Sequence, residues 1–180
     1  RVTQTVTFAY NALGQRVSKS VNGQTTLFQY DHDGSLIAEI DAATGKPLRE
    51  HIHANGEPIA QLSAGVNGEV KVHYVHADHL GTPTLLTDQS GRVVADIEAT
   101  PFGEAYIDYT AIDHNRRFPG QYKDEETGLH YNYFRDYDPS LGRYIQSDPI
   151  GLNGGLNTYV YAYNNPHYWI DPYGLLNRVK

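Results

Sequence analysis

Two aspartates in the last third of the chain, Asp148 and Asp171, each open the same short pattern, Asp-Pro-x-Gly-Leu. No Lys, Arg, Asp or Glu lies between them, so two carboxyl groups bracket a segment without formal charge. Two carboxyl groups held close together can hydrolyse a peptide bond: the ionised one takes a proton from water, and the protonated one polarises the carbonyl or protonates the amine. An aspartyl protease pair is therefore one interpretation of this region.

The same pattern is also an ordinary turn, which is the competing interpretation. Asp can cap a turn, Pro fixes its φ, and Gly takes a positive φ. Asp136 and Asp138 are rival acids, but their place at the end of a predicted strand favours roles in turns. For Asp148 and Asp171 to meet, the chain between them must turn back, and several residues there favour turns: Gly151, Gly154, Gly155 and the Asn-Asn-Pro run at 164–166.

Three histidines, His73, His76 and His79, recur at every third position and could form one side of a metal site if the segment were helical. The segment has no helical stripe of apolar residues, and no closed set of four ligands can be recognised around it. We therefore predict no metal site, and nothing in the sequence indicates another cofactor.

The elements that must position the two aspartates are predicted to be short β-strands. Residues 10–17 and 30–37 share an aromatic residue, then Asn or Asp, then Gly, and each run leads into apolar or alternating residues. A period of roughly 20 residues is typical of stacked hairpins that cannot bury a core one at a time. Asn22-Gly23 and Asn67-Gly68 are further hairpin signals, so residues 1 to 110 predict an extended β-sheet.

The last third is rich in aromatic residues. Ten of the 15 tyrosines lie between Tyr122 and Tyr173, and we expect them to pack between strands rather than to bind a ligand. The run from Tyr131 to Asp138 alternates and predicts one strand that ends at a turn. Helix is predicted to be scarce, with short candidates only at 78–80 and 113–117.

Composition excludes several classes of protein. With 14 basic and 21 acidic residues the net charge is −7, which argues against a nucleic-acid surface. The absence of Cys excludes a disulfide framework, and no run approaches the roughly 20 apolar residues of a membrane span. The absence of Met favours a piece of a longer protein, whose export signal is expected to lie outside this sequence.

The region from Tyr122 to Leu175 resembles the Rhs repeat-associated core of the Rhs/YD-repeat proteins. The resemblance rests on the two Asp-Pro-x-Gly-Leu copies together with other motifs of that core: Tyr131-Asn132-Tyr133-Phe134-Arg135-Asp136-Tyr137-Asp138-Pro139, Gly142-Arg143-Tyr144, Gly154-Gly155-Leu156-Asn157 and Tyr161-Ala162-Tyr163-Asn164-Asn165-Pro166. The stretch from Tyr74 to Glu104 looks like the segment that precedes this core, and the weak repeats upstream look like YD repeats.

This resemblance implies a fold. In such polymorphic-toxin and ABC-toxin C-component shells, YD-repeat hairpins form a spiralling β-sheet around a hollow interior, and the core coils inward as a plug. We therefore expect an all-β protein with three parts. Residues 1–117 are the repeat sheet, 118–175 the core with the autoprotease, and 176–180 the start of a variable C-terminal segment.

The resemblance also implies an activity. The core is expected to act as an intramolecular aspartyl protease that cuts once, between Leu175 and Leu176, and acts on no other substrate. The family assigns the acid roles to Asp148 and Asp171, and Arg143 matches its Gly-Arg-Tyr arginine. That guanidinium could stabilise the oxyanion or hold the cleaved strand.

The expected partners are the protein's own upstream shell and a C-terminal toxin, with secretion-system or immunity proteins as further candidates. The protein is expected to be secreted or delivered at the bacterial cell surface, with no nucleic-acid partner and no membrane span. The alternative is a non-catalytic structural or cell-surface YD-repeat module whose turns only resemble the protease motif.

Overall fold

The computed structural model describes residues 4–65 and 67–180. These residues form two compact units. The first unit holds residues 1–75 and 87–92, and the second holds 76–86 and 93–180. The core motifs and both aspartates lie in the second unit, which is therefore the one that positions the candidate site.

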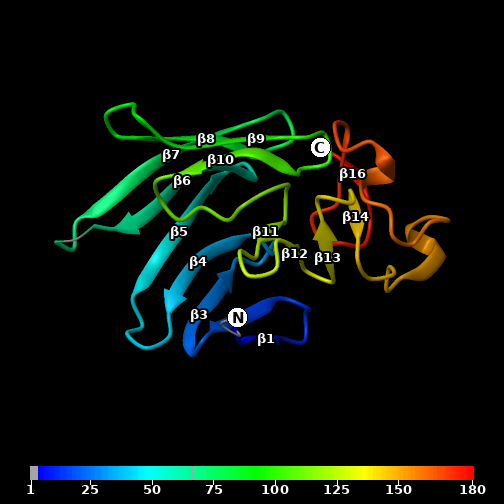
Figure 1. Cartoon of the computed structure of the whole chain (residues 1–180), viewed down its shortest axis with the longest axis horizontal. Helices are drawn as coiled ribbons and strands as arrows, with labels where there is room; N and C mark the ends of the chain where they lie inside the picture. Colours follow the sequence, from blue (N-terminus) through cyan, green and yellow to red (C-terminus); the bar gives the residue numbers. More distant parts are fainter. Residues whose placement is uncertain (1–3, 66) are drawn as a thin grey trace. The chain divides into compact units, whose positions relative to one another are not determined.

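The first unit is an antiparallel meander in which each strand pairs with the next along the chain (Figure 1). Its strands are β1 (Val6–Tyr10), β2 (Arg16–Val21), β3 (Gln24–Tyr30), β4 (Leu36–Asp41), β5 (Pro47–Ala54), β6 (Glu57–Ala64) and β7 (Val70–Ala77), the last of which ends just beyond the unit.

The turns of this meander explain the weak sequence repeat. The Oδ1 atom of Asn11 accepts hydrogen bonds from the amides of Leu13 and Gln15, at 3.0 Å each, and Oδ1 of Asp31 accepts one from Ser35 at 2.8 Å. The repeated Asn or Asp thus caps each turn with its own side chain, because a short side-chain oxygen can reach the amides two and four residues on.

The first unit contains a buried charged group, the carboxylate of Glu39. Glu39 of β4, 1% exposed, pairs with Arg49 of β5 through Oε1 to Nε (2.9 Å) and Oε2 to Nη2 (2.6 Å), and its Oε1 also contacts His51 at 3.1 Å. Burial alone would raise the pKa of Glu39, but the hydrogen bonds and charges of Arg49 and His51 outweigh it and hold the pKa far below its ordinary value. This carboxylate therefore depends on its partners.

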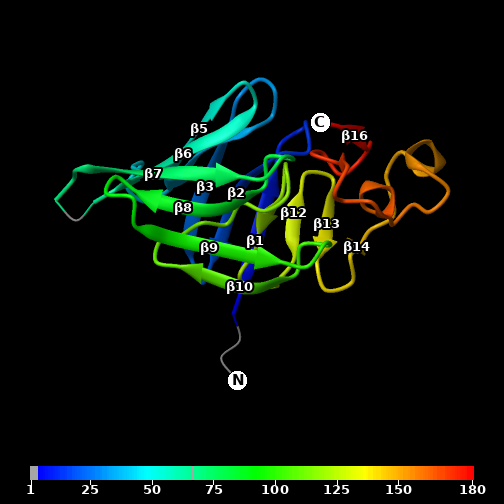
Figure 2. The ribbon, with the colours of Figure 1, turned by 90° about the horizontal axis from the view of Figure 1, so that it is seen from above.

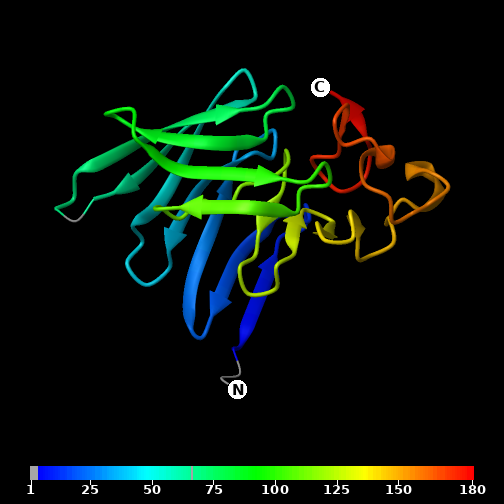
Figure 3. The same ribbon diagram turned by 45° about the horizontal axis from the view of Figure 1, so that its top comes forward.

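The second unit begins with longer strands and ends in short ones. Its strands are β8 (Pro83–Asp88), whose last two residues belong to the first unit, β9 (Val93–Ala99), β10 (Ala105–Thr110), β11 (Tyr122–Lys123), β12 (His130–Asn132), β13 (Arg135–Asp138), β14 (Arg143–Tyr144), β15 (Trp169–Ile170) and β16 (Arg178–Val179). Strands β9 and β10 lie side by side as an antiparallel pair (Figure 2), and β11 to β14 form a second small sheet. The C-terminal strand β16, red in Figure 3, pairs with β15.

The prediction of a single strand from Tyr131 to Asp138 is wrong, because the structure has two strands there, β12 and β13. The chain reverses between Asn132 and Arg135, which face each other in the β12–β13 ladder. Tyr133 takes φ 56°, a left-handed conformation that non-glycine residues seldom adopt. This reversal has a consequence for the site, since it turns Arg135 inward.

Three tyrosines form the core of the second unit. Tyr137, Tyr144 and Tyr161 are fully buried, with ring centroids 4.8 to 5.8 Å apart, and Phe118 stacks on Tyr161 at 5.4 Å. Aromatic rings at these distances attract one another beyond the area they bury. The expectation that the tyrosines serve packing is confirmed for these three.

The all-β prediction is also confirmed. Strands make up 48% and helix 4% of the structure described for residues 4–65 and 67–180, and its antiparallel sheets are not closed. The helical content consists of two short 3-10 turns, η1 (Gly151–Gly154) and η2 (Ala162–Asn164), so neither short helix candidate upstream forms. Among the described residues, no helix has the length and apolar character that crossing a bilayer requires. The predicted boundaries at 117 and 175 stay predictions.

Candidate functional site

The structure brings Asp148 and Asp171 together on a single nitrogen atom. The Nη2 atom of Arg135 lies 3.0 Å from Oδ2 of Asp148 and 3.1 Å from Oδ2 of Asp171. Asp148 is 7% exposed and Asp171 is not exposed at all. The chain between the two aspartates therefore does turn back, through η1 and η2, as the meeting of the carboxyl groups requires.

Arg135 is held by three further contacts. Its Nε donates to the carbonyl oxygen of Gly174 at 2.6 Å, and its Nη1 donates to that of Thr158 at 3.0 Å. The guanidinium also lies over the Tyr144 ring, 3.7 Å from the centroid. A planar guanidinium with donors on three nitrogens can hold several acceptors in fixed positions at once, so Arg135, buried on β13, fixes both aspartates and the chain that follows Asp171.

Each aspartate also caps its own turn. Oδ1 of Asp148 accepts the amide of Ile150 at 3.0 Å, and Oδ1 of Asp171 accepts the amide of Leu175 at 2.9 Å. The turn interpretation and the paired-acid interpretation are thus compatible, because Oδ1 serves the turn while Oδ2 meets Arg135.

The carbonyl of Leu175, which belongs to the predicted cleaved bond, and the Asp148 carboxyl group both border Gly154. A methyl group added at Gly154 would lie 2.4 Å from Oδ2 of Asp148 and 3.2 Å from the Leu175 oxygen. A side chain at Gly154 would therefore occupy the space between the acid and the bond, so the glycine keeps that space open.

The residues before this bond are fixed in place. The Tyr173 carbonyl accepts the Phe134 amide at 3.4 Å, and the Gly174 carbonyl accepts Arg135 as described above. A methyl group on Gly174 would come within 2.6 Å of the Asn132 carbonyl oxygen, so the chain approaches β12 more closely than any other residue type would allow. Beyond the bond, Leu176 is 57% exposed.

The structure places Arg143, the predicted partner of the aspartates, elsewhere. Arg143 is exposed, and its guanidinium lies over the Tyr159 ring at 4.7 Å and contacts the Tyr144 carbonyl at 3.4 Å. The arginine that contacts both carboxylates is Arg135, which the sequence analysis left without a role. Its place in the run from Tyr131 to Asp138 gave no sign of this role, because both aspartates lie far along the chain.

The rival acids occupy turns and ladders near the surface. Asp136 accepts a hydrogen bond from the Gln146 side chain at 2.7 Å, and Asp138 caps the turn that contains Ser140. The turn interpretation holds for Asp138, whereas Asp136 lies within β13 and its contact joins it to a residue ten positions on.

The three spaced histidines do not converge. His73 is buried in β7, while His79 contacts the carbonyl oxygen of His167 through Nε2 at 2.8 Å. Within residues 4–65 and 67–180, no cluster of three His, Asp or Glu side chains could hold a metal ion.

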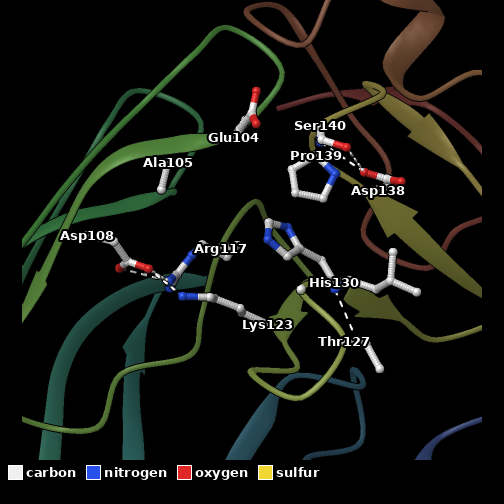
Figure 4. Close-up of a pocket in the computed structure, with 13 residues that line it drawn as sticks. Glu104, Ala105, Asp108, Arg117, Lys123, Thr127, His130, Asp138, Pro139 and Ser140 are labelled. Carbon is white, nitrogen blue, oxygen red and sulfur yellow. Dashed lines mark hydrogen bonds and ion pairs between the residues drawn. The ribbon is translucent and has the colours of Figure 1, made fainter. Parts of the chain in front are cut away.

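A cavity of about 360 Å³ lies apart from the aspartate pair, between β10 and the small sheet (Figure 4). Arg117 and Lys123 point toward Asp108 there, and Arg117 Nη2 lies 3.0 Å from its Oδ1. His130 also lines the cavity; burial, then the charges of Arg117 and Lys123, lower its pKa to about 3. Both cations of the lining, Arg117 and Lys123, are paired with Asp108, and two further acidic residues, Glu104 and Asp138, also line the cavity.

Comparison with known proteins decides the family. Residues 63–167 match the Teneurin YD-shell family, which is more than half of the chain. The chain belongs to the YD-shell family. Three curated relatives are bacterial proteins, and two of them are named as toxins. Double-stranded DNA deaminase toxin A of Burkholderia cenocepacia is 35% identical over 93% of this chain, and toxin protein Tse5 of Pseudomonas aeruginosa is 40% identical over 72%. Probable deoxyribonuclease RhsA of Dickeya dadantii is 35% identical over 93%.

Solved structures agree on the fold. The TcdB2-TccC3-TEV crystal structure matches 97% of the YD-shell chain with a TM-score of 0.74 at 23% identity, which covers 9% of that chain. A Tc holotoxin pore of Photorhabdus luminescens that carries a TccC3 mutation matches 97% with a TM-score of 0.73, again at 23% identity and 9% of that chain. The family resemblance stated from the sequence is confirmed.

The YD-shell chain spans only a small part of these relatives. It covers 14% of the deaminase toxin, 10% of Tse5 and 12% of RhsA. The activities in those names belong to the whole relatives. What the chain shares with them is the shell-type fold of toxin-associated proteins.

Proposed function

We propose that this chain is the core end of a toxin-enclosing YD shell that cuts its own backbone between Leu175 and Leu176. The observation that carries the proposal is the meeting of Asp148 and Asp171 on one Arg135 nitrogen, with Asp148 and the Leu175 carbonyl both bordering Gly154. Because substrate and acids belong to one chain, the effective concentration of the bond is high and a single turnover needs no outside substrate pocket.

The contacts favour different roles for the two aspartates. Each carboxyl group receives donors on both oxygens, but Asp171 receives three, from Arg135, Tyr144 and the Leu175 amide, whereas Asp148 receives two, from Arg135 and the Ile150 amide. The greater number of donors on Asp171 suits the role of the ionised acceptor, and Asp148 borders Gly154 together with the Leu175 carbonyl. We assign Asp171 as the base and Asp148 as the acid.

The proposed reaction consumes one water molecule. Asp171 takes a proton from water as the oxygen attacks the Leu175 carbonyl carbon, and Asp148 gives its proton to the carbonyl oxygen. The tetrahedral intermediate then expels the Leu176 nitrogen, which leaves as an amine after receiving the proton held by Asp171. Asp148 regains its proton as the new Leu175 carboxyl group forms. Arg135 stabilises the charge on the two carboxyl groups throughout.

The proposed consequence is release of the segment that begins at Leu176. The named toxins among the relatives support a toxin as that segment, enclosed by the protein's own upstream shell, and delivery outside the producing cell as its setting. Secretion-system and immunity proteins stay candidate partners.

The proposal is tested with the full precursor, followed on a denaturing gel. Asp148→Asn and Asp171→Asn keep the shape of each side chain and should leave the precursor uncut. Gly154→Ala keeps both acids but should slow cutting about 100-fold, because a displacement of about 1 Å at the reacting atoms has that effect. Continued cutting after Leu175 in both Asn variants would refute the mechanism.

A non-catalytic surface module is the second candidate. Salivary gland surface protein 1 of Aedes aegypti, 30% identical over 96% of the chain, carries a name that favours it, although the chain covers only 5% of that relative. An unmodified precursor that stays intact would support this reading. Cutting at Asp171-Pro172 alone would indicate acid lability of that bond rather than catalysis.

A further inference from the structure

We propose that Tyr144 is a positioning residue of this site: its hydroxyl hydrogen is directed onto Asp171 by Asn132, which keeps Asp171 in the accepting state. The inference rests on the proposed self-cleavage and adds a residue whose role is distinct from those of the two acids. It also gives the Gly-Arg-Tyr motif a functional member other than Arg143.

The direction of the hydrogen bonds follows from the acceptor at one end. Nδ2 of Asn132 lies 2.8 Å from the backbone carbonyl oxygen of Asp171, which can only accept, so the amide must present its NH₂ group there. The same nitrogen lies 2.7 Å from the Tyr144 oxygen and therefore donates to it as well. The single hydrogen of the Tyr144 hydroxyl is left for Oδ2 of Asp171, at 3.0 Å.

The side chains that form these hydrogen bonds are shielded from water. Tyr144 and Asn132 are both fully buried. Burial first, and then the charge of Asp171, raise the pKa of Tyr144 well above its ordinary value, so the hydroxyl keeps its hydrogen at every pH at which the site can work.

Asn132 carries a cost in folding stability. Within the described part of the chain, Oδ1 of Asn132 is buried without a hydrogen-bond partner. An unpaired buried polar atom costs about 1–3 kcal/mol. The nitrogen of the Asn132 amide donates two hydrogen bonds at the site, whereas its oxygen accepts none. A role in orienting Tyr144 explains this arrangement better than a contribution to stability alone.

The surroundings of Asp171 show what the hydroxyl adds. Facing its carboxylate are Arg135 from β13, Tyr144 from β14, Asp148 across the shared guanidinium nitrogen, and the buried Tyr161. Arg135 is divided between two carboxylates, whereas the Tyr144 hydroxyl serves Asp171. The hydroxyl therefore gives Oδ2 of Asp171 a donor in addition to Arg135, while Oδ1 accepts the Leu175 amide.

The test is Tyr144→Phe in the full precursor, with Tyr137→Phe as the matched control. Both tyrosines are fully buried in the same cluster, but the Tyr137 hydroxyl donates to the Phe102 carbonyl at 2.6 Å. Tyr144→Phe keeps the ring under Arg135 and should slow cleavage about 10- to 100-fold, as loss of one preorganised donor does. Tyr137→Phe should change the rate by less than about 2-fold, since its hydroxyl serves no reacting group.

The pH profile separates positioning from a structural effect. Loss of a donor that favours an ionised base should move the low-pH limb of the cleavage rate to higher pH in Tyr144→Phe and leave it in place in Tyr137→Phe. Asn132→Leu, which keeps the hydroxyl but removes the group that orients it, should also slow cleavage. Equal slowing by both Phe variants, or an unmoved limb, overturns the inference.

Failure of this inference differs from failure of the proposed function. If Asp171→Asn is inactive while Tyr144→Phe cuts at the normal rate, only the positioning role is lost. If Asp171→Asn itself still cuts after Leu175, the proposed protease mechanism fails.

Discussion

At the scale of single residues, each aspartate of the pair uses its two carboxylate oxygens for different tasks. Oδ1 caps a turn and Oδ2 meets the Arg135 guanidinium. The cap fixes the rotation of the side chain, so the oxygen offered to the site is held by the same turn that ordinary Asp-Pro-x-Gly sequences form. In this chain the turn therefore orients the carboxyl group that is proposed to act in cleavage.

The two arginines near the site give opposite expectations. Arg135→Lys keeps the charge but loses the planar group that reaches both carboxylates and two carbonyls, so we expect cleavage of the precursor to slow about 100-fold. The rate is measured by gel time course, with thermal melting as the check on folding.

Arg143→Lys is the matched control, because Arg143 is exposed and contacts Tyr159. As a surface change it should alter the rate by less than about 2-fold. The reverse ranking of the two variants would return the role to Arg143 and contradict the site described above.

At the scale of elements, local signals predicted more than long-range ones. The hairpins followed from Asn, Asp and Gly at turn positions, since such turns depend on a few adjacent residues. The reversal at Tyr133 was missed because an alternating aromatic run without Gly or Pro resembles one strand. Arg135 was missed for a related reason: its partners lie in two turns far along the chain, and no local pattern encodes that meeting.

Pairing between β4 and β5 gives a stability prediction. Arg49→Met leaves Glu39 buried without its main partner, so the free energy of unfolding should fall by about 3 kcal/mol at pH 7, measured by urea denaturation. Arg92→Met is the control: Arg92 pairs with Asp88 at the surface, 82% exposed, and its loss should cost less than about 1 kcal/mol. Equal losses would contradict the assigned burial.

The Glu39–Arg49 pair also makes the free energy of unfolding depend on pH. Because the folded pKa of Glu39 lies below its unfolded value, its contribution is complete above the ordinary pKa of 4.5 and is lost as the pH falls toward the folded value. The unmodified protein should therefore lose stability below about pH 4.5 more steeply than Arg49→Met. Parallel pH curves for the two proteins would show that Glu39 is not held ionised by Arg49.

At the scale of the whole molecule, the proposed cleavage is a single chemical event in a protein of the YD-shell family. The second copy of Asp-Pro-x-Gly-Leu contains one aspartate of the proposed pair and ends at the bond that is proposed to be cut. Since both belong to one chain, the half-time of cleavage should not depend on protein concentration.

The most direct test of the central claim is intact-mass spectrometry of the precursor after cleavage in water enriched in oxygen-18. Hydrolysis by the proposed route gives an N-terminal product that ends at Leu175 and carries one heavy oxygen in its new carboxyl group. It also gives a C-terminal product that begins at Leu176 without added label. An intact precursor, or products cut at any other bond, would contradict the account.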